Sequence, residues 1–392
     1  MENLFDSAGP MGQLLPSATL AITSKAKAMK AAGEDVCSLS AGEPDFDTPE
    51  NIKQAAIEAI QGGQTKYTPA TGLPQLKEII AKKFKDENGI DTSAAQVVVA
   101  PGAKFSVFSA IAALCGAGDE VIIAAPYWVS YPEMIEACGA TVKVINCTAD
   151  NNYEIAPEEL EANVNDKTKL LILNTPSNPT GAVYRKATLE AIAKIAVDKN
   201  FMILSDEIYE KLVYDTDAPH ISIASLSKEV NDLTITVNGL SKAYAMTGWR
   251  LGYLTAPLVL TKKISSLQSH TTSNPTTFAQ FGAIEAIAGD QSEVEKMRQQ
   301  FSVRRDLIFK IISDIPGVEC IRPTGAFYIF CDVSSFGLTS HDFCAGLLEK
   351  FQVAVIPGEP FGAPGNIRLS YACSEEQIIK ATDRLREYCA SL

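Results

Sequence analysis

Histidine is scarce in this chain, which has 392 residues and only three histidines, His220, His270 and His341. Their spacing matches no metal-ligand pattern, so we expect structural or surface roles for them and no metal site. The nine cysteines include no CxxC pair. This argues against a zinc site or a disulfide framework and favours reduced thiols in a cytoplasmic protein.

Long apolar runs are absent as well. No stretch of about 18 apolar residues exists to span a membrane, and the first residues lack the basic and then apolar pattern of a signal peptide. The formal net charge is −13, so neither nucleic acid nor an anionic membrane is expected as a partner. The sequence shows no internal repeat.

The length of the chain favours two domains. From about residue 95 to 257, short β-rich runs alternate with helical patterns, and we predict strands at 97–100, 121–125, 141–145, 170–173, 201–204 and 233–237. Runs this apolar are typical of strands that helices cover on both faces. The sequence therefore predicts an α/β fold with a mostly parallel central sheet.

The C-terminal part resembles a smaller α+β domain, with strands predicted at 326–331, 353–356 and 367–370 and a helical pattern at 23–32 that packs with it. We predict an N-terminal arm at 1–15, a small domain formed by 16–46 and 303–392, and a large domain at 47–302.

Polar residues follow five of the predicted strands. They comprise Gly102, Ala103 and Lys104; Tyr127 and Trp128; Asn174 and Asn178; Ser205, Asp206 and Tyr209; and Asn238, Ser241 and Lys242. In open α/β sheets, ligands bind beyond the carboxyl ends of the strands. Five such clusters predict one binding cleft.

Several of these residues have more than one interpretation. The helix start at Gly102 suits an anion. Asp206 is either the N-cap of a following helix or a carboxylate that pairs with a cationic ring nitrogen. Lys242 is either a surface lysine or a buried nucleophile that forms an imine with an aldehyde cofactor. Trp128 by itself suggests packing.

Seven motifs carry a resemblance to a known family: GEPDFDTP at 42–49, KYTPATG at 66–72, APYWVSYPEM at 125–134, SNPTG at 177–181, SDEIYE at 205–210, SKAYAMTGWRLGY at 241–253 and NIRLSYA at 366–372. With them the chain resembles class I, fold type I aminotransferases that depend on pyridoxal phosphate, in the bacterial and plastid-type aspartate aminotransferase branch. The resemblance covers residues from about 14 to the end.

The resemblance implies a role for each matching residue. Lys242 binds the cofactor covalently and moves the proton at the substrate Cα, while Asp206 holds the ring nitrogen protonated. Tyr209 and Asn178 donate to the ring oxygen, and Trp128 stacks on the ring. The phosphate is bound by Gly102, Ala103, Lys104, Ser241, Arg250 and, from a neighbouring subunit, Tyr67, so a homodimer is implied.

The resemblance also implies how substrate is bound. Arg368 grips the α-carboxylate, although Arg368 alone also fits a strand-edge surface charge. Gly42 approaches the substrate. The segment 268–277 contains no arginine for a second carboxylate, and this branch uses Lys104 with Ser17 and Thr19. Those two hydroxyls also fit caps of a helix that starts near Thr23.

We therefore expect transamination between aspartate and 2-oxoglutarate by ping-pong kinetics. The alternatives within the class are aminotransferases for prephenate, with glutamate or aspartate as donor, and for aromatic amino acids or alanine. Outside it stand a pyridoxal-phosphate-dependent C–S lyase and a cofactor-binding regulator without turnover, and the latter usually carries a basic DNA-binding domain that this acidic chain has no room for.

Overall fold

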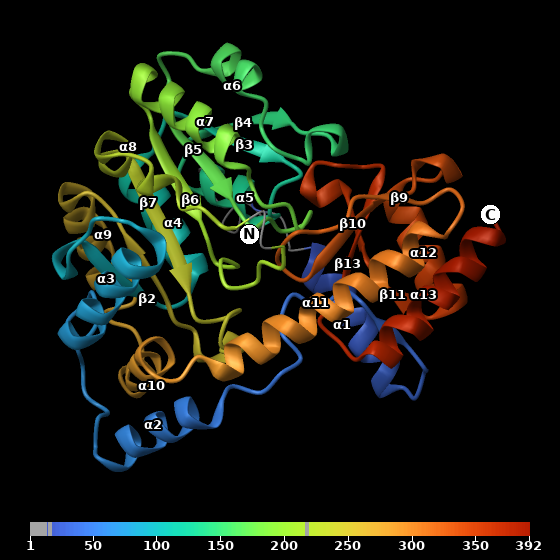
Figure 1. Cartoon of the computed structure of the whole chain (residues 1–392), viewed down its shortest axis with the longest axis horizontal. Helices are drawn as coiled ribbons and strands as arrows, with labels where there is room; N and C mark the ends of the chain where they lie inside the picture. Colours follow the sequence, from blue (N-terminus) through green and yellow to red (C-terminus); the bar gives the residue numbers. More distant parts are fainter. Residues whose placement is uncertain (1–13, 15–17, 216–218) are drawn as a thin grey trace, which may run out of the picture.

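The computed structural model describes residues 14, 18–215 and 219–392, and only the backbone of residues 18–21. Most of the predicted arm at 1–15, and Ser17, therefore lie outside the described residues. Figure 1 shows two units side by side, a larger one built on a broad sheet and a smaller one that contains the C-terminus, with helix α11 extending from one to the other.

A seven-stranded sheet in the order β2-β8-β7-β6-β5-β3-β4 forms the larger unit. Its strands are β2 (Val97–Ala100), β3 (Glu120–Ala125), β4 (Thr141–Asn146), β5 (Thr168–Asn174), β6 (Met202–Asp206), β7 (Thr234–Gly239) and β8 (Gly252–Thr255). Only β8 runs antiparallel to its neighbours β2 and β7 among these pairs. The predicted mostly parallel sheet is confirmed; β8 was not predicted.

Helices cover both faces of this sheet, because successive residues of a strand point to opposite faces. In β3, Val121 and Ile123 pack with α4 (Ala103–Leu114), α5 (Ser130–Ala137) and α9 (Leu258–Thr271). Ile122 between them packs on the other face. The helices of that face are α6 (Pro157–Asn163), α7 (Lys186–Lys199) and α8 (Lys228–Asp232).

The β2 end of the sheet is closed by two further helices, α3 (Pro74–Asn88) and α10 (Thr277–Ala288). Helix α10 also packs on α2 (Glu50–Gln61), the helix of the larger unit that lies lowest in Figure 1. Gly282 on α10 allows this approach, because a Cβ there would lie 3.3 Å from the carbonyl oxygen of Ile52 on α2 and 2.7 Å from the ring of Trp249.

The smaller unit contains a four-stranded antiparallel sheet in the order β12-β13-β10-β9 and a parallel pair β1-β11. Its strands are β1 (Cys37–Ser38), β9 (Glu319–Cys320), β10 (Tyr328–Asp332), β11 (Val353–Ala354), β12 (Ile356–Pro357) and β13 (Asn366–Ser370), and its helices are α1 (Ala18–Ala31), α11 (Ser292–Ser313), α12 (Ser340–Phe351) and α13 (Glu375–Ala390). The predicted α+β character is confirmed.

Several predicted boundaries in this unit were wrong. The strand predicted at 326–331 starts only at Tyr328, because Ala326 has a φ of 56°, which a strand does not accommodate. The run 353–356 is two strands that belong to different sheets. The helix predicted from Thr23 begins at Ala18.

Helix α11 spans 22 residues without a break. The predicted boundary between residues 302 and 303 falls inside it, and Phe301 already packs in the core of the smaller unit. The predicted division into domains stays a prediction. Among the described residues, no helix is both long and apolar enough to cross a membrane.

Candidate active site

Lys242 lies just beyond β7, at the carboxyl edge of the large sheet. Its ammonium donates to the carbonyl oxygen of Gly42 at 2.5 Å and lies 5.9 Å from the ring centroids of Tyr209 and Phe327. Burial lowers the pKa of Lys242 to about 8, with a smaller opposing effect from Glu43. A lysine with this pKa carries a substantial neutral fraction near neutral pH and is a competent nucleophile. The surface-lysine interpretation is therefore wrong.

Asp206 is the last residue of β6, and only 5% of it is exposed. Its carboxylate accepts hydrogen bonds from the Tyr131 hydroxyl at 2.8 Å and from the backbone N–H of Ile208 at 3.3 Å. The residues that follow form turns rather than a helix, so the alternative of a helix N-cap was wrong. Burial raises the pKa of Asp206 to about 6, against the lowering effect of the two donors.

The surroundings of Asp206 fit the ring nitrogen of pyridoxal phosphate. Both of its hydrogen-bond donors are neutral, and the attraction of Lys242 is the smallest of the influences on its pKa. A buried carboxylate without a close cation is unfavourable. A protonated ring nitrogen at this position would supply the missing charge, and Asp206 would in turn keep that nitrogen protonated.

Arg368 lies on β13, which has β12 on one side and β10 on the other, and 3% of it is exposed. The alternative of a strand-edge surface charge was therefore wrong. Its guanidinium donates to Asn178 Oδ1 at 2.9 Å and to the Ser40 carbonyl at 3.1 Å, and it lies 4.4 Å from the ring centroid of Tyr328. Its Nε is buried without a partner among the described residues.

Tyr209 and Asn178 connect the cofactor residues to Arg368. The Tyr209 hydroxyl lies 2.9 Å from the Tyr328 hydroxyl, and the same Tyr328 ring lies beneath the guanidinium. Asn178 follows β5 and accepts from Arg368 through its amide oxygen, so its amide NH₂ is the group that can donate to a ligand. Contacts through Tyr209 and Tyr328 thus link Lys242 to Arg368. Asn174 links Asp206 to the same group, because its amide donates to the Asp206 carbonyl and accepts from the backbone N–H of Asn178.

The start of α4 has the features of a phosphate site. Gly102 is the N-cap residue with a φ of 89°, and a Cβ there would lie 2.4 Å from Nη2 of Arg250. Arg250 is exposed and held by a bond from its Nη1 to the Thr247 carbonyl at 2.8 Å. A helix N-terminus with an adjacent guanidinium binds anions well. Ala103 opens the helix, and Ser241 is buried in the turn after β7.

Lys104 and Trp128 lie together beside this helix start. The ammonium of Lys104 is 4.9 Å from the Trp128 ring centroid, and burial, with Arg250, lowers the pKa of Lys104. The Trp128 ring meets Tyr131 edge-on at 5.2 Å. Tyr131 contacts the Trp128 ring and also donates to the Asp206 carboxylate. It therefore connects Trp128 and the Lys104 ammonium to Asp206.

Three predicted site residues are not placed in this cluster. Tyr67, between α2 and α3, is 87% exposed. Ser17 lies outside the described residues. Thr19 lies inside α1, so it is not the N-cap of that helix, and its side chain is outside the description.

Sequence reasoning missed Tyr131, Tyr328 and Ser40. Tyr131 follows Trp128 by three residues within a recognised motif, which is the one signal that the sequence offers for it. Tyr328 lies in an ordinary apolar strand, and the Ser40 contact is made by a backbone carbonyl, which no side-chain pattern reveals.

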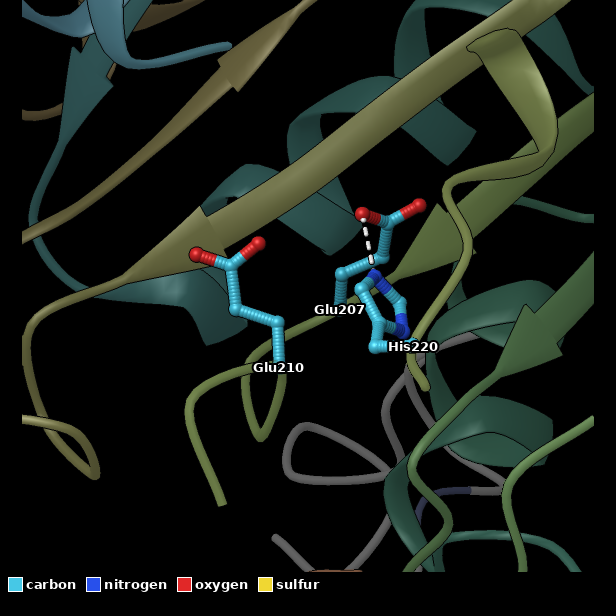
Figure 2. A group of neighbouring side chains, drawn as sticks. All are labelled: Glu207, Glu210 and His220. Carbon is cyan, nitrogen blue, oxygen red and sulfur yellow. Dashed lines mark hydrogen bonds and ion pairs between the residues drawn. The ribbon is translucent and has the colours of Figure 1, made fainter. Parts of the chain in front are cut away.

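Glu207, Glu210 and His220 form a second cluster behind the Asp206 turn (Figure 2), with one potential metal ligand atom from each within 4.8 Å of the others. Glu207 is completely buried and accepts from His220 Nε2 at 3.0 Å. The Lys83 ammonium bonds Glu210. Although burial opposes it, Lys83 followed by His220 lowers the pKa of Glu210 to about 2. The Lys83 cation thus already compensates Glu210, and Glu207 accepts from Ser205, Ser222 and His220, so the cluster is a buried polar network.

Comparison with known proteins finds relatives that match nearly the whole length of the chain. Residues 34–385 match the family described as aminotransferase class I and II. An aspartate aminotransferase of Bacillus sp. (strain YM-2) is 49% identical, over 96% of this chain and 97% of that protein. A probable aspartate/prephenate aminotransferase of Aquifex aeolicus is 44% identical, over 97% and 98%. The solved Thermus thermophilus aspartate aminotransferase with maleate is 41% identical, with a TM-score of 0.93 over 97% of this chain and 98% of that chain.

Proposed function

The chain belongs to the class I and II aminotransferases, and we propose that it transfers the amino group of L-aspartate to 2-oxoglutarate, forming oxaloacetate and L-glutamate. It is a fold type I enzyme whose cofactor is pyridoxal 5′-phosphate. The assignment of individual residues below is part of the proposal.

When bound, the cofactor supplies an aldehyde that combines with an amine and a ring that takes up the electron pair released at the substrate Cα. Lys242 holds the cofactor and then, as a neutral amine, accepts the Cα proton and returns it to the neighbouring carbon. Its pKa of about 8 supports both roles. Asp206 keeps the ring cationic, and Tyr209 and Asn178 orient it through donors.

Arg368 is proposed to bind the α-carboxylate of every substrate. A guanidinium offers two parallel donors to a carboxylate, which an ammonium does not. The Tyr328 ring and Asn178 fix its plane before substrate arrives, so little side-chain freedom is lost on binding.

The choice of aspartate depends on its second carboxylate. One observation supports this choice above all. The Lys104 ammonium at the start of α4 lies 4.9 Å from the ring centroid of Trp128, so a cation is present beside the proposed ring site. Ser17 and Thr19 are proposed to add hydroxyl donors, and Gly42 to approach the substrate with its backbone. The names of the relatives support this choice, and one of them adds prephenate as a second candidate acceptor.

The active enzyme is proposed to be a homodimer in the cytoplasm. Tyr67, with 87% of its surface exposed in one chain, is proposed to reach the cofactor phosphate of the neighbouring subunit. All nine cysteines are free thiols, which supports a reducing compartment.

A panel of amino donors with 2-oxoglutarate as acceptor tests the proposal. We expect the highest kcat/KM with aspartate, with glutamate and oxaloacetate as products. Turnover of aspartate far below that of alanine, tyrosine or the transamination product of prephenate would overturn the substrate assignment. Release of pyruvate and ammonia from cysteine conjugates would instead indicate the C–S lyase.

Lys242→Ala tests whether Lys242 is the residue that binds the cofactor covalently. This variant is expected to lose the absorbance of the covalently bound cofactor and nearly all activity, because no second amine occupies this position. Retention of that absorbance would refute the assignment of Lys242.

A further inference from the structure

Cys320 and Cys331 lie opposite each other in the small sheet. They are Cα partners in the antiparallel pair β9–β10. Residues directly opposite in such a pair have Cα atoms about 4.5–5.5 Å apart and side chains on the same face. A disulfide needs a Cα separation of about 4.4–6.8 Å. The register therefore already meets the backbone requirement for a bond between the two sulfurs.

The two thiols differ in access to solvent. Cys331 is completely buried, whereas Cys320 is half-buried and lines a groove of about 610 Å³. The groove lies between the ends of β3 and β4 of the large sheet and the edge of the small sheet, and Asp150 and Asp332 also line it. A small oxidant in solvent reaches Cys320 from this groove, whereas Cys331 is buried and does not line it.

Cys320 is also the most acidic of the thiols. Burial raises the pKa of the eight other cysteines. The pKa of Cys320 alone is lowered, because the Cys331 thiol donates a hydrogen bond to its sulfur. A thiolate, not a thiol, is the form that attacks a peroxide, and a reactive thiol beside a second one is the usual arrangement of a redox-sensitive pair.

We propose that Cys320 and Cys331 form an oxidation site at which hydrogen peroxide converts the two thiols into one disulfide. The Cys320 thiolate attacks a peroxide oxygen, an S–O bond forms as the O–O bond breaks, and the released hydroxide takes a proton to become water. The Cys331 sulfur then attacks the Cys320 sulfur. An S–S bond forms as the S–O bond breaks, and the hydroxyl leaves as water with the Cys331 proton. Two thiols are oxidised and one peroxide is reduced to two waters.

The experiment treats the holoenzyme with hydrogen peroxide, blocks the remaining thiols by alkylation and maps the peptides by mass spectrometry. Chymotrypsin is suitable because it cuts after aromatic side chains, and Phe327 and Tyr328 lie between the two cysteines. We expect the count of free thiols to fall by two from nine, with a disulfide-linked peptide pair that contains Cys320 and Cys331.

Cys320→Ser is expected to abolish this loss of two thiols, and Cys147→Ser is the matched control. Cys147 lines the same groove and is half-buried, but burial raises its pKa to about 12, so its removal should leave disulfide formation unchanged. Cys331→Ala should stop the oxidation at the sulfenic acid of Cys320, which a dimedone label detects. If Cys331→Ala fails to fold, the disulfide-linked peptide from the wild type is the result that tests the proposal.

A disulfide that links other cysteines, or a loss of two thiols that persists in Cys320→Ser, would overturn the proposal. So would nine free thiols after peroxide treatment. The proposal is independent of the amino donor, because none of these measurements uses turnover.

Discussion

At the scale of residues, replacing Arg368 tests substrate binding separately from folding. On the proposed assignment, Arg368→Lys removes one of two charge-assisted donors to the α-carboxylate, each of which contributes about 1.5–3 kcal/mol. We expect kcat/KM for aspartate to fall about 10- to 100-fold, on the scale of about 1.4 kcal/mol per factor of ten, with KM raised. Steady-state kinetics with both substrates measures this.

Arg305→Lys is the control for Arg368→Lys. Arg305 is similarly buried, at 2% exposed, but it lies on α11 and its guanidinium donates to Asp215. Its replacement should lower the melting temperature and leave KM unchanged. An equal change of KM in both variants would contradict the assignment of Arg368.

The raised pKa of Asp206 leads us to expect that the stability of the cofactor-free protein depends on pH. Burial raises its pKa from 3.8 to about 6, so the protonated form is favoured by folding. Its contribution to stability is fully present below about pH 4 and is lost as the pH rises through about 6. The change corresponds to about 3 kcal/mol, and urea unfolding at a series of pH values measures it.

Asp206→Asn should remove this dependence, because the amide does not titrate. Bound cofactor should also reduce it in the wild type, since a ring cation stabilises the ionised carboxylate. A wild-type profile parallel to that of the variant between pH 4 and 6 would show that Asp206 titrates normally.

At the scale of elements, the start of α4 is built around Gly102. Gly102→Ala places a methyl group against the guanidinium of Arg250, which a Cβ would approach to 2.4 Å. Displacing this guanidinium removes one charge-assisted bond to the phosphate, so we expect the Kd for pyridoxal phosphate to rise at least about tenfold. Cofactor titration followed by absorbance measures it.

Gly118→Ala is the matched control for the backbone. Gly118 has a φ of 94°, close to that of Gly102, but a Cβ there would meet nothing within 4 Å. Both variants should lose about 1–2 kcal/mol of stability from the unfavourable φ, and only Gly102→Ala should lose cofactor affinity. Equal affinities in the two variants would argue against the phosphate site.

The elements that sequence predicted best are the buried parallel strands. The predicted strand at 97–100 is β2 without a change of bounds, and 170–173 lies inside β5, because short continuous apolar runs bounded by turn residues are typical of buried strands. Strand β8 was missed because it begins inside the lysine motif, and its short run has no periodicity of its own. The two-residue strands β1 and β9 depend on distant partners, which local patterns do not specify.

At the scale of the whole molecule, the proposed shared site predicts an outcome for mixed dimers. Lys242→Ala and Tyr67→Ala subunits are each expected to be poorly active as homodimers when cofactor is limiting. In a mixed dimer, one site then carries both changes and the other carries neither. Activity after refolding a mixture should exceed that of both parents.

If Tyr67 acts within its own subunit, every site of the mixed dimer keeps one defect and no activity is recovered. Sedimentation of the mixture checks that dimers form. The two outcomes differ without any assumption about the substrate.

The candidate site was predictable where motifs encode it. Lys242, Asp206 and Arg368 all lie in quoted motifs. The structure joins Lys242 to Arg368 through Tyr209 and Tyr328, and Asp206 to Arg368 through Asn174 and Asn178. The joining contacts were not predictable, since Tyr328 and Arg368 are 40 positions apart in the chain and meet only because β10 and β13 pair side by side. The Lys83 network behind Asp206 was equally hidden, because α3 supplies its cation from far along the chain.

The two units contribute different groups to the proposed site, and this has a consequence for how such an enzyme changes over evolutionary time. Lys242, Asp206 and Gly102 lie at the ends of strands in the large sheet, whereas Arg368 and the Ser40 carbonyl belong to the smaller unit. On the proposed assignment, substitutions at Ser17 and Thr19 therefore change the selectivity for the substrate side chain and leave Lys242, Asp206 and Arg368 in place. New amino donors are accessible from this scaffold by drift in one small region, while the reaction type is inherited unchanged.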